Sequence, residues 1–236
     1  MKRLVLTAVG LALVVGIWTM ALTGCASDKV VEKIVVVTPT VAPTSTPEPK
    51  PALAVQDAAY YLDVTDTLPG FARLDPREEG MTKEAWAPYW GKYVEEMFSD
   101  FQLYLSEKPF DYVFMTMGVF PSKIDLAAWK AQMRDQETFS QQALAGFAKG
   151  FAARSGVPEA EAPQPSMTWR DVAVGDSAKL GEFSLLYESG QVQMDMVIMF
   201  DENAVVFIYD MWYPAEPPAV DILTIARAVS GRMANR

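Results

Sequence analysis

The sequence contains no histidine, so it lacks the side chain that most often carries acid–base and metal chemistry. Its 236 residues include 30 acidic and 20 basic side chains. Histidine is the usual general base near neutral pH and the commonest metal ligand. Its absence excludes Ser–His and Cys–His nucleophilic mechanisms. Carboxylates are the acid–base groups that remain, and no Gly-rich phosphate loop or Ser-x-x-Lys motif accompanies them.

Cysteine is nearly absent as well, since Cys25 is the single thiol of the chain. One cysteine cannot form an intramolecular disulfide, so the fold must be held together by packing. Half of the residues are apolar, which is enough for a packed core. These features predict one globular domain, which we place at residues 52–236.

Runs of basic residues are also missing after the first three positions. The formal net charge is −10, and it reaches −12 once Lys2 and Arg3 are removed with the N-terminal segment. A chain this acidic repels phosphate backbones unless it carries a local basic patch. The composition therefore disfavours nucleic-acid binding.

The N-terminus has the pattern of an export signal. Lys2 and Arg3 precede residues 4–22, which contain no charged side chain. The tetrapeptide Leu22-Thr23-Gly24-Cys25 at the end of this run resembles the lipobox of bacterial lipoproteins. That resemblance implies removal of residues 1–24, attachment of diacylglycerol and palmitate to Cys25, and anchoring to the cell membrane on its extracytoplasmic side.

An uncleaved membrane anchor is the alternative, because the apolar run approaches the roughly 20 residues that span a bilayer. We favour lipidation because the only cysteine lies at the lipobox position. Residues 25–51 form a tether rich in proline and threonine, a composition that favours extended chain and buries no core. Within it, residues 29–37 are apolar and β-prone; a spacer is favoured over pairing with a sheet edge.

The remainder of the sequence predicts an α+β fold. Aromatic residues at helical spacing predict a helix from Pro88 to Leu105, and residues 111–120 predict a strand. Period-two patterns then predict an antiparallel three-strand meander over residues 183–211. A final helix is predicted from Pro217-Pro218 onward. We expect these helices to pack on an antiparallel sheet.

The segment from Asp171 to Ser177 has a Gly-Asp loop that leads into three strands and a terminal helix. This C-terminal part is similar to lipoprotein domains of the PsbP-like or LpqN-like type. The resemblance implies a fold type and transfers no catalytic residues.

Four aromatic residues next to prolines are candidates for a ligand-binding surface. They are Trp86 and Tyr89 beside Pro88, and Trp212 and Tyr213 before Pro214. Aromatic side chains combine a broad apolar face with a polar edge, which suits recognition. The alternative is that such residues face the core, and we favour it for the neighbouring helical pair Trp90 and Tyr93.

Two pairs of alternating methionines offer soft sulfur ligands of the kind that Cu(I) prefers. These pairs, Met115 with Met117 and Met194 with Met196, lie in apolar strand patterns, so a core role is favoured. Asp195 lies between two of these methionines on the opposite face of its strand, where solvent exposure would explain it. The sequence selects no pair of catalytic carboxylates and no metal site, and no cofactor is predicted.

The sequence thus predicts a non-enzymatic, membrane-tethered extracytoplasmic domain that binds an unidentified protein or small molecule. A cell-envelope hydrolase that uses carboxylates is the second interpretation, and an accessory subunit of a membrane complex is the third. The predicted membrane contact is the lipid on Cys25. An exposed apolar groove would favour binding, whereas convergent acids of raised pKa would favour the enzyme.

Overall fold

The structure is a computed structural model that describes residues 52–84, 97–120, 165–187 and 190–235, together with positions 126, 127, 130, 131, 141, 158 and 161. The lipobox, Cys25, the tether up to residue 51, and the candidate residues Trp86 and Tyr89 lie outside the described residues.

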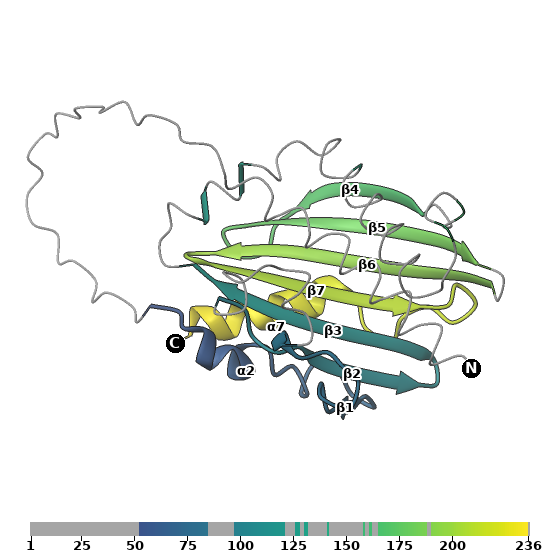
Figure 1. The fold of residues 1–236 in the computed structure, drawn as a ribbon, viewed down its shortest axis with the longest axis horizontal. Helices are drawn as coiled ribbons and strands as arrows, with labels where there is room; N and C mark the ends of the chain where they lie inside the picture. Colours follow the sequence, from purple (N-terminus) through teal and green to yellow (C-terminus); the bar gives the residue numbers. More distant parts are fainter. Residues whose placement is uncertain are drawn as a thin grey trace, which may run out of the picture.

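Seven antiparallel strands form one sheet in the order β1-β2-β3-β7-β6-β5-β4 (Figure 1). The strands are β1 Ala72–Leu74, β2 Gln102–Glu107, β3 Phe110–Val119, β4 Ser166–Val172, β5 Ser177–Tyr187, β6 Gly190–Asp201 and β7 Ala204–Trp212. Strands β4 to β7 pair in sequence order, as do β1 to β3. The long-range pairing of β3 with β7 joins the two sets into one sheet.

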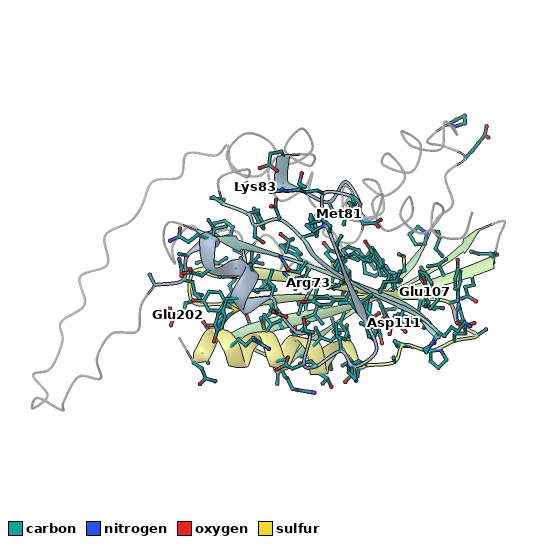
Figure 2. All side chains as sticks on the ribbon, turned by 90° about the horizontal axis from the view of Figure 1, so that it is seen from below. Arg73, Met81, Lys83, Glu107, Asp111 and Glu202 are labelled. Carbon is teal, nitrogen blue, oxygen red and sulfur yellow. The ribbon has the colours of Figure 1, made fainter. Side chains whose placement is uncertain are left out.

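Helical segments whose full bounds lie within the described residues are η1 Val55–Asp57, α2 Ala58–Tyr61 and α7 Ile222–Ala234. Helix α7 begins at the N-cap residue Asp221, whose side chain accepts a hydrogen bond from the Leu223 amide. Its inward side chains recur at helical spacing and are buried. Figure 2 shows α7 along one side of the sheet, with the labelled Met81 and Lys83 on the other side.

Both faces of the sheet are buried by apolar side chains. We call the face toward α7 the α7 face; Met115, Val197 and Ile208 share its buried cluster with Ile225 and Val229 of the helix. The opposite face, here the aromatic face, carries a second cluster. Its stacked rings, Phe114 and Tyr209, have centroids 4.6 Å apart. Because both faces are buried, the central strands are almost continuously apolar.

The predicted α+β class and antiparallel sheet are confirmed, but the helix predicted from Pro88 to Leu105 is wrong at its end. Residues 102–107 form strand β2, and Phe98 makes an isolated bridge to Gly118. Leu103 and Leu105 face the aromatic cluster, whereas Tyr104 faces the α7 cluster. A strand buried on both faces lacks clean alternation, so its aromatic residues happened to match the helical period.

The start of the final helix and one edge strand also differ from the prediction. The final helix begins at Ile222 rather than at Pro217-Pro218, because Asp221 supplies the N-cap and the prolines belong to the preceding loop. Strand β4 has no counterpart in the predicted elements. It is an edge strand whose residues are mostly exposed, so its sequence lacks the apolar signal of the inner strands.

Candidate functional site: a row of carboxyl groups across the sheet

The α7 face carries a line of polar side chains across four neighbouring strands. Thr168 of β4 is paired with Glu182 of β5, Glu182 with Asp195 of β6, and Asp195 with Asp210 of β7. Alternation along each strand puts these side chains on the same face as Leu180, Val197 and Ile208. We call Glu182, Asp195 and Asp210 the acidic row.

A second polar line runs beside the acidic row. Asp111 of β3 is paired with Ser106 on one side and Trp212 on the other, and Trp212 is paired with Gln193. Asp111 is therefore a diagonal neighbour of Asp210, within the reach of side chains across a sheet. The two lines make one end of the α7 face polar, whereas the part that α7 covers is apolar.

Burial increases along the acidic row toward the middle of the sheet. Glu182 is exposed, Asp195 is partly buried, and Asp210 is only 1% exposed. Asp111, next to the inner end of the row, is fully buried. The row thus leads from solvent to a pair of carboxyl groups inside the protein.

The chain between β7 and α7 lies against the buried pair. The Ala219 amide donates a hydrogen bond of 2.7 Å to Asp111 Oδ2, and the Phe110 amide donates one of 2.9 Å to Glu216 Oε2. Figure 1 shows this chain leaving the end of β7 and turning back into α7, and Figure 2 shows Asp111 on the side of the sheet that faces it. Two carboxyl groups thus fix residues 213–221 to β3.

Three oxygens of the buried pair receive no hydrogen bond from any N–H or hydroxyl group of the described residues. They are Asp111 Oδ1 and both carboxyl oxygens of Asp210. An isolated carboxylate in such a place is costly, and a carboxyl group there retains its proton instead. Burial without such partners favours the neutral form of Asp210 and raises its pKa.

The surroundings raise the pKa of two members of the row. Burial is the largest cause for Asp210, followed by the neighbouring Asp111 carboxyl group and by the charges of Asp195 and Asp221; together they hold its pKa well above the ordinary value. Burial and then the Glu182 charge raise the pKa of Asp195 to about 6, against a smaller lowering by Arg170. Both shifts favour the neutral carboxyl group at pH values where an ordinary aspartate is ionised.

The structure places Trp212 and Tyr213 on opposite faces of the sheet. Trp212 follows the alternation of Ile208 and Asp210 onto the α7 face. Tyr213 packs on the aromatic face, where its ring centroid lies 5.3 Å from that of Phe110. The two rings do not form one platform, and Trp212 alone adjoins the acidic row.

The methionine pairs also lie on opposite faces. Met115 and Met117 belong to the cluster under α7, whereas Met194 and Met196 belong to the aromatic face. All four side chains are buried. The two pairs therefore do not converge on one four-sulfur site, and each fills apolar space.

Sequence reasoning singled out Asp195 but missed Asp111 and Asp210. The signal was present, since each of the two is a lone acid within an apolar stretch of strand. A charged residue is rarely buried in such a stretch without a reason. The pairing that brings the two together joins strands far apart in sequence, and the sequence pattern does not specify it.

Two structural features are missing from the described part of the chain. Among the described residues, no group of three or more Asp, Glu, His or Cys side chains is arranged to hold a metal ion. Within the same residues, no helix has the length and apolar content that a membrane crossing requires.

Comparison with known proteins gives matches among solved structures alone. No family model matches the chain, and no curated protein matches it. Among solved structures, the chain is similar to the extracellular domain of PknH from Mycobacterium tuberculosis, with a TM-score of 0.43 and 11% sequence identity. The match covers 78% of this chain and 98% of that one. Any function of this chain therefore has to be inferred from its own residues.

Proposed function

We propose that the protein is a membrane-tethered extracytoplasmic domain that binds a ligand or partner through the end of the α7 face marked by the acidic row. Two kinds of support lead to this proposal. The lipobox resemblance and the proline-rich residues that follow Cys25 supply the location. The acidic row supplies the binding surface.

The observation that carries the proposal is the graded burial of the row, from the exposed Glu182 to the buried and incompletely satisfied Asp210. A sheet face packed for stability alone would place apolar residues at such inner positions, because buried charges seldom add stability. Perturbed carboxyl groups that lead to the surface are typical of functional sites. The sheet holds them on rigid strands, which suits recognition.

Binding is favoured over catalysis because the two inner carboxyl groups do not reach solvent. Asp210 is 1% exposed and Asp111 is fully buried, and residues 213–221 are fixed to β3 beside them. A catalytic acid or base must come within hydrogen-bond distance of its substrate. In this arrangement the outer residues Asp195 and Glu182 contact the ligand, and the inner pair lies buried behind them.

Site-specific photo-crosslinking in the membrane-anchored full chain tests the proposal. A photoreactive amino acid at position 182 is expected to capture a partner, which mass spectrometry of protein and small-molecule adducts then identifies. The same group at position 171 is the matched control, since Asp171 is exposed on β4 but alternates onto the aromatic face. Equal capture at both positions, or capture at neither, would contradict the proposal.

A carboxylate-dependent hydrolase is the second candidate, and a specific observation favours it. Burial and the Glu182 charge raise the pKa of Asp195 to about 6, which makes this partly exposed carboxyl group a candidate acid or base near neutral pH. Turnover of the captured ligand by wild type, with loss of turnover in Asp195→Asn, would establish this reading over simple binding.

A further inference from the structure

We propose that the acidic row and Trp212 form a binding site for a primary alkylammonium group. This inference rests on the proposed function and names the chemical class of its ligand. The acids Glu182 and Asp195, the indole of Trp212 and the buried Asp210 carry it. Their arrangement supplies what an ammonium needs: negative charge, several acceptors and an aromatic surface.

Negative charge is concentrated along the row. Its three carboxyl groups stand on neighbouring strands, which lie about 4.8 Å apart in a sheet. Arg170 at the edge strand counters them, but its effect on Asp195 is smaller than the opposing effects of burial and Glu182. The local field is therefore negative and attracts a cation.

Asp210 is a buried acid behind the residues that contact the ligand, and the described residues leave its oxygens unsatisfied. This side chain lies beside Asp195 on the same face, and neither of its oxygens receives a hydrogen bond from an N–H or hydroxyl group of the described residues. The group is 1% exposed, so solvent does not satisfy it. A ligand cation bound at Asp195 would favour the ionised form of the neighbouring Asp210.

Trp212 supplies the aromatic surface. Its side chain is partly exposed on the α7 face and is paired with Gln193, which makes it a diagonal neighbour of Asp195. An indole face attracts a cation within about 6 Å of the ring, and tryptophan does so best. A carboxylate beside an exposed indole is a combination that recognises an ammonium bearing an apolar chain.

Ammonium fits this surface better than guanidinium. Guanidinium is a planar fork that matches the two oxygens of one carboxylate. The row instead presents carboxyl groups in line on separate strands, with their burial increasing inward. A compact ammonium with three donors can face several such groups at once. The alkyl chain behind it would lie along the indole.

Calorimetric titration of the full-length protein in detergent with n-butylammonium tests the inference. We expect binding that n-butanol does not reproduce, because the alcohol lacks the charge. Asp195→Asn should weaken binding about tenfold, as expected for loss of one charge-assisted hydrogen bond. Trp212→Leu should weaken it about threefold through the lost cation–π contact. Asp171→Asn, on the other face, should leave the affinity unchanged, and thermal melts establish that each variant is folded.

A second readout is the release of protons on binding. A bound cation favours the ionised forms of Asp195 and Asp210, so titrations at pH 6 in buffers of different ionisation enthalpy should show net proton release. The affinity should rise with pH through the pKa of Asp195, which is about 6. Binding with no proton release, or equal binding by wild type and Asp195→Asn, would overturn the inference.

Two arms of the titration distinguish the source of the ammonium. A tetralysine peptide that binds much more tightly than n-butylammonium would identify lysine side chains of a protein partner. Equal affinity per ammonium group would identify a small amine. If photo-crosslinking at position 182 captures a partner but neither cation binds, the ligand class is wrong while the binding function stands.

Discussion

At the scale of single residues, the informative positions are acids that interrupt apolar strands. Asp111 and Asp210 are buried diagonal neighbours, and burial together with the nearby Asp111 raises the pKa of Asp210. Asp210 cannot ionise without cost, because its oxygens receive no hydrogen bond from the described residues. The protonation of Asp210 therefore links the stability of the fold to pH.

Asp210→Asn is expected to stabilise the protein at pH 8. The raised pKa of Asp210 means that its contribution to stability is fully present below about pH 4, near the ordinary pKa of an aspartate, and declines as pH rises toward the pKa of the folded state. An asparagine keeps the neutral form at every pH and donates to Asp111 Oδ1. The gain at pH 8 should be about 1 kcal/mol, the scale of one intramolecular hydrogen bond.

Urea unfolding at pH 4.5 and pH 8 measures this effect. The difference between Asp210→Asn and wild type should be larger at pH 8, whereas the exposed control Asp171→Asn should track wild type at both. A loss of stability in Asp210→Asn that is equal at the two pH values would show that Asp210 is not a protonated donor.

At the scale of elements, the end of the loop before α7 affects both the helix and the acidic row through one residue, Asp221. Asp221 caps the helix through its hydrogen bond to the Leu223 amide, at 3.1 Å. The same carboxylate raises the pKa of both Asp195 and Asp210. One residue thus stabilises the start of α7 and adds negative charge near the row.

Substitutions of Asp221 separate these two roles. Asp221→Ala removes the cap and should cost about 1 kcal/mol of unfolding free energy, measured by urea denaturation. Asp221→Asn keeps a capping oxygen, so its cost should be much smaller. Both variants remove the charge, so both should lower the pKa of Asp195, measured by NMR titration of its carboxyl carbon. A pKa of Asp195 that is unchanged in both would contradict this placement of Asp221.

The elements were predictable where the local apolar pattern was strong and fitted one period. The strands β5 to β7 and the apolar stripe of α7 follow local periodicity, and the structure contains them close to the predicted positions. The prediction failed for β2, whose aromatic residues match the helical period, and for β4, which is an exposed edge. In both cases the pattern of apolar residues reflects neighbours that the local sequence does not specify.

At the scale of the whole molecule, the net negative charge and the N-terminal segment both bear on how the protein would be attached to a membrane. The protein has a net charge of −10, and its lipobox-like segment is separated from the described fold by a proline-rich stretch. Charge of this sign keeps the protein from adhering to anionic head groups. Attachment would then depend on the lipid of Cys25, and the acidic row would be free to meet a cationic ligand.

Cys25→Ala should abolish the incorporation of a clickable fatty-acid analogue and move the protein out of the membrane fraction or leave it as an unprocessed precursor. The physical reason is that two acyl chains hold a protein stably at a bilayer, whereas the proline-rich segment alone has no such affinity. Ser27→Ala, two residues away, is the control and should label like wild type. Equal labelling of Cys25→Ala would contradict lipidation at this residue.

The sequence by itself determined the α+β class, the antiparallel strands near the C-terminus and the position of the last helix, because periodicity and capping act over a few residues. It also set the chemical inventory, with carboxyl groups available and histidine absent. Only the tertiary structure decided that Asp111 and Asp210 meet, that Asp195 and Glu182 continue the row, and that Trp212 rather than Tyr213 adjoins it. An alternating pattern specifies which face a residue occupies, but the register of distant strands decides which residues become neighbours.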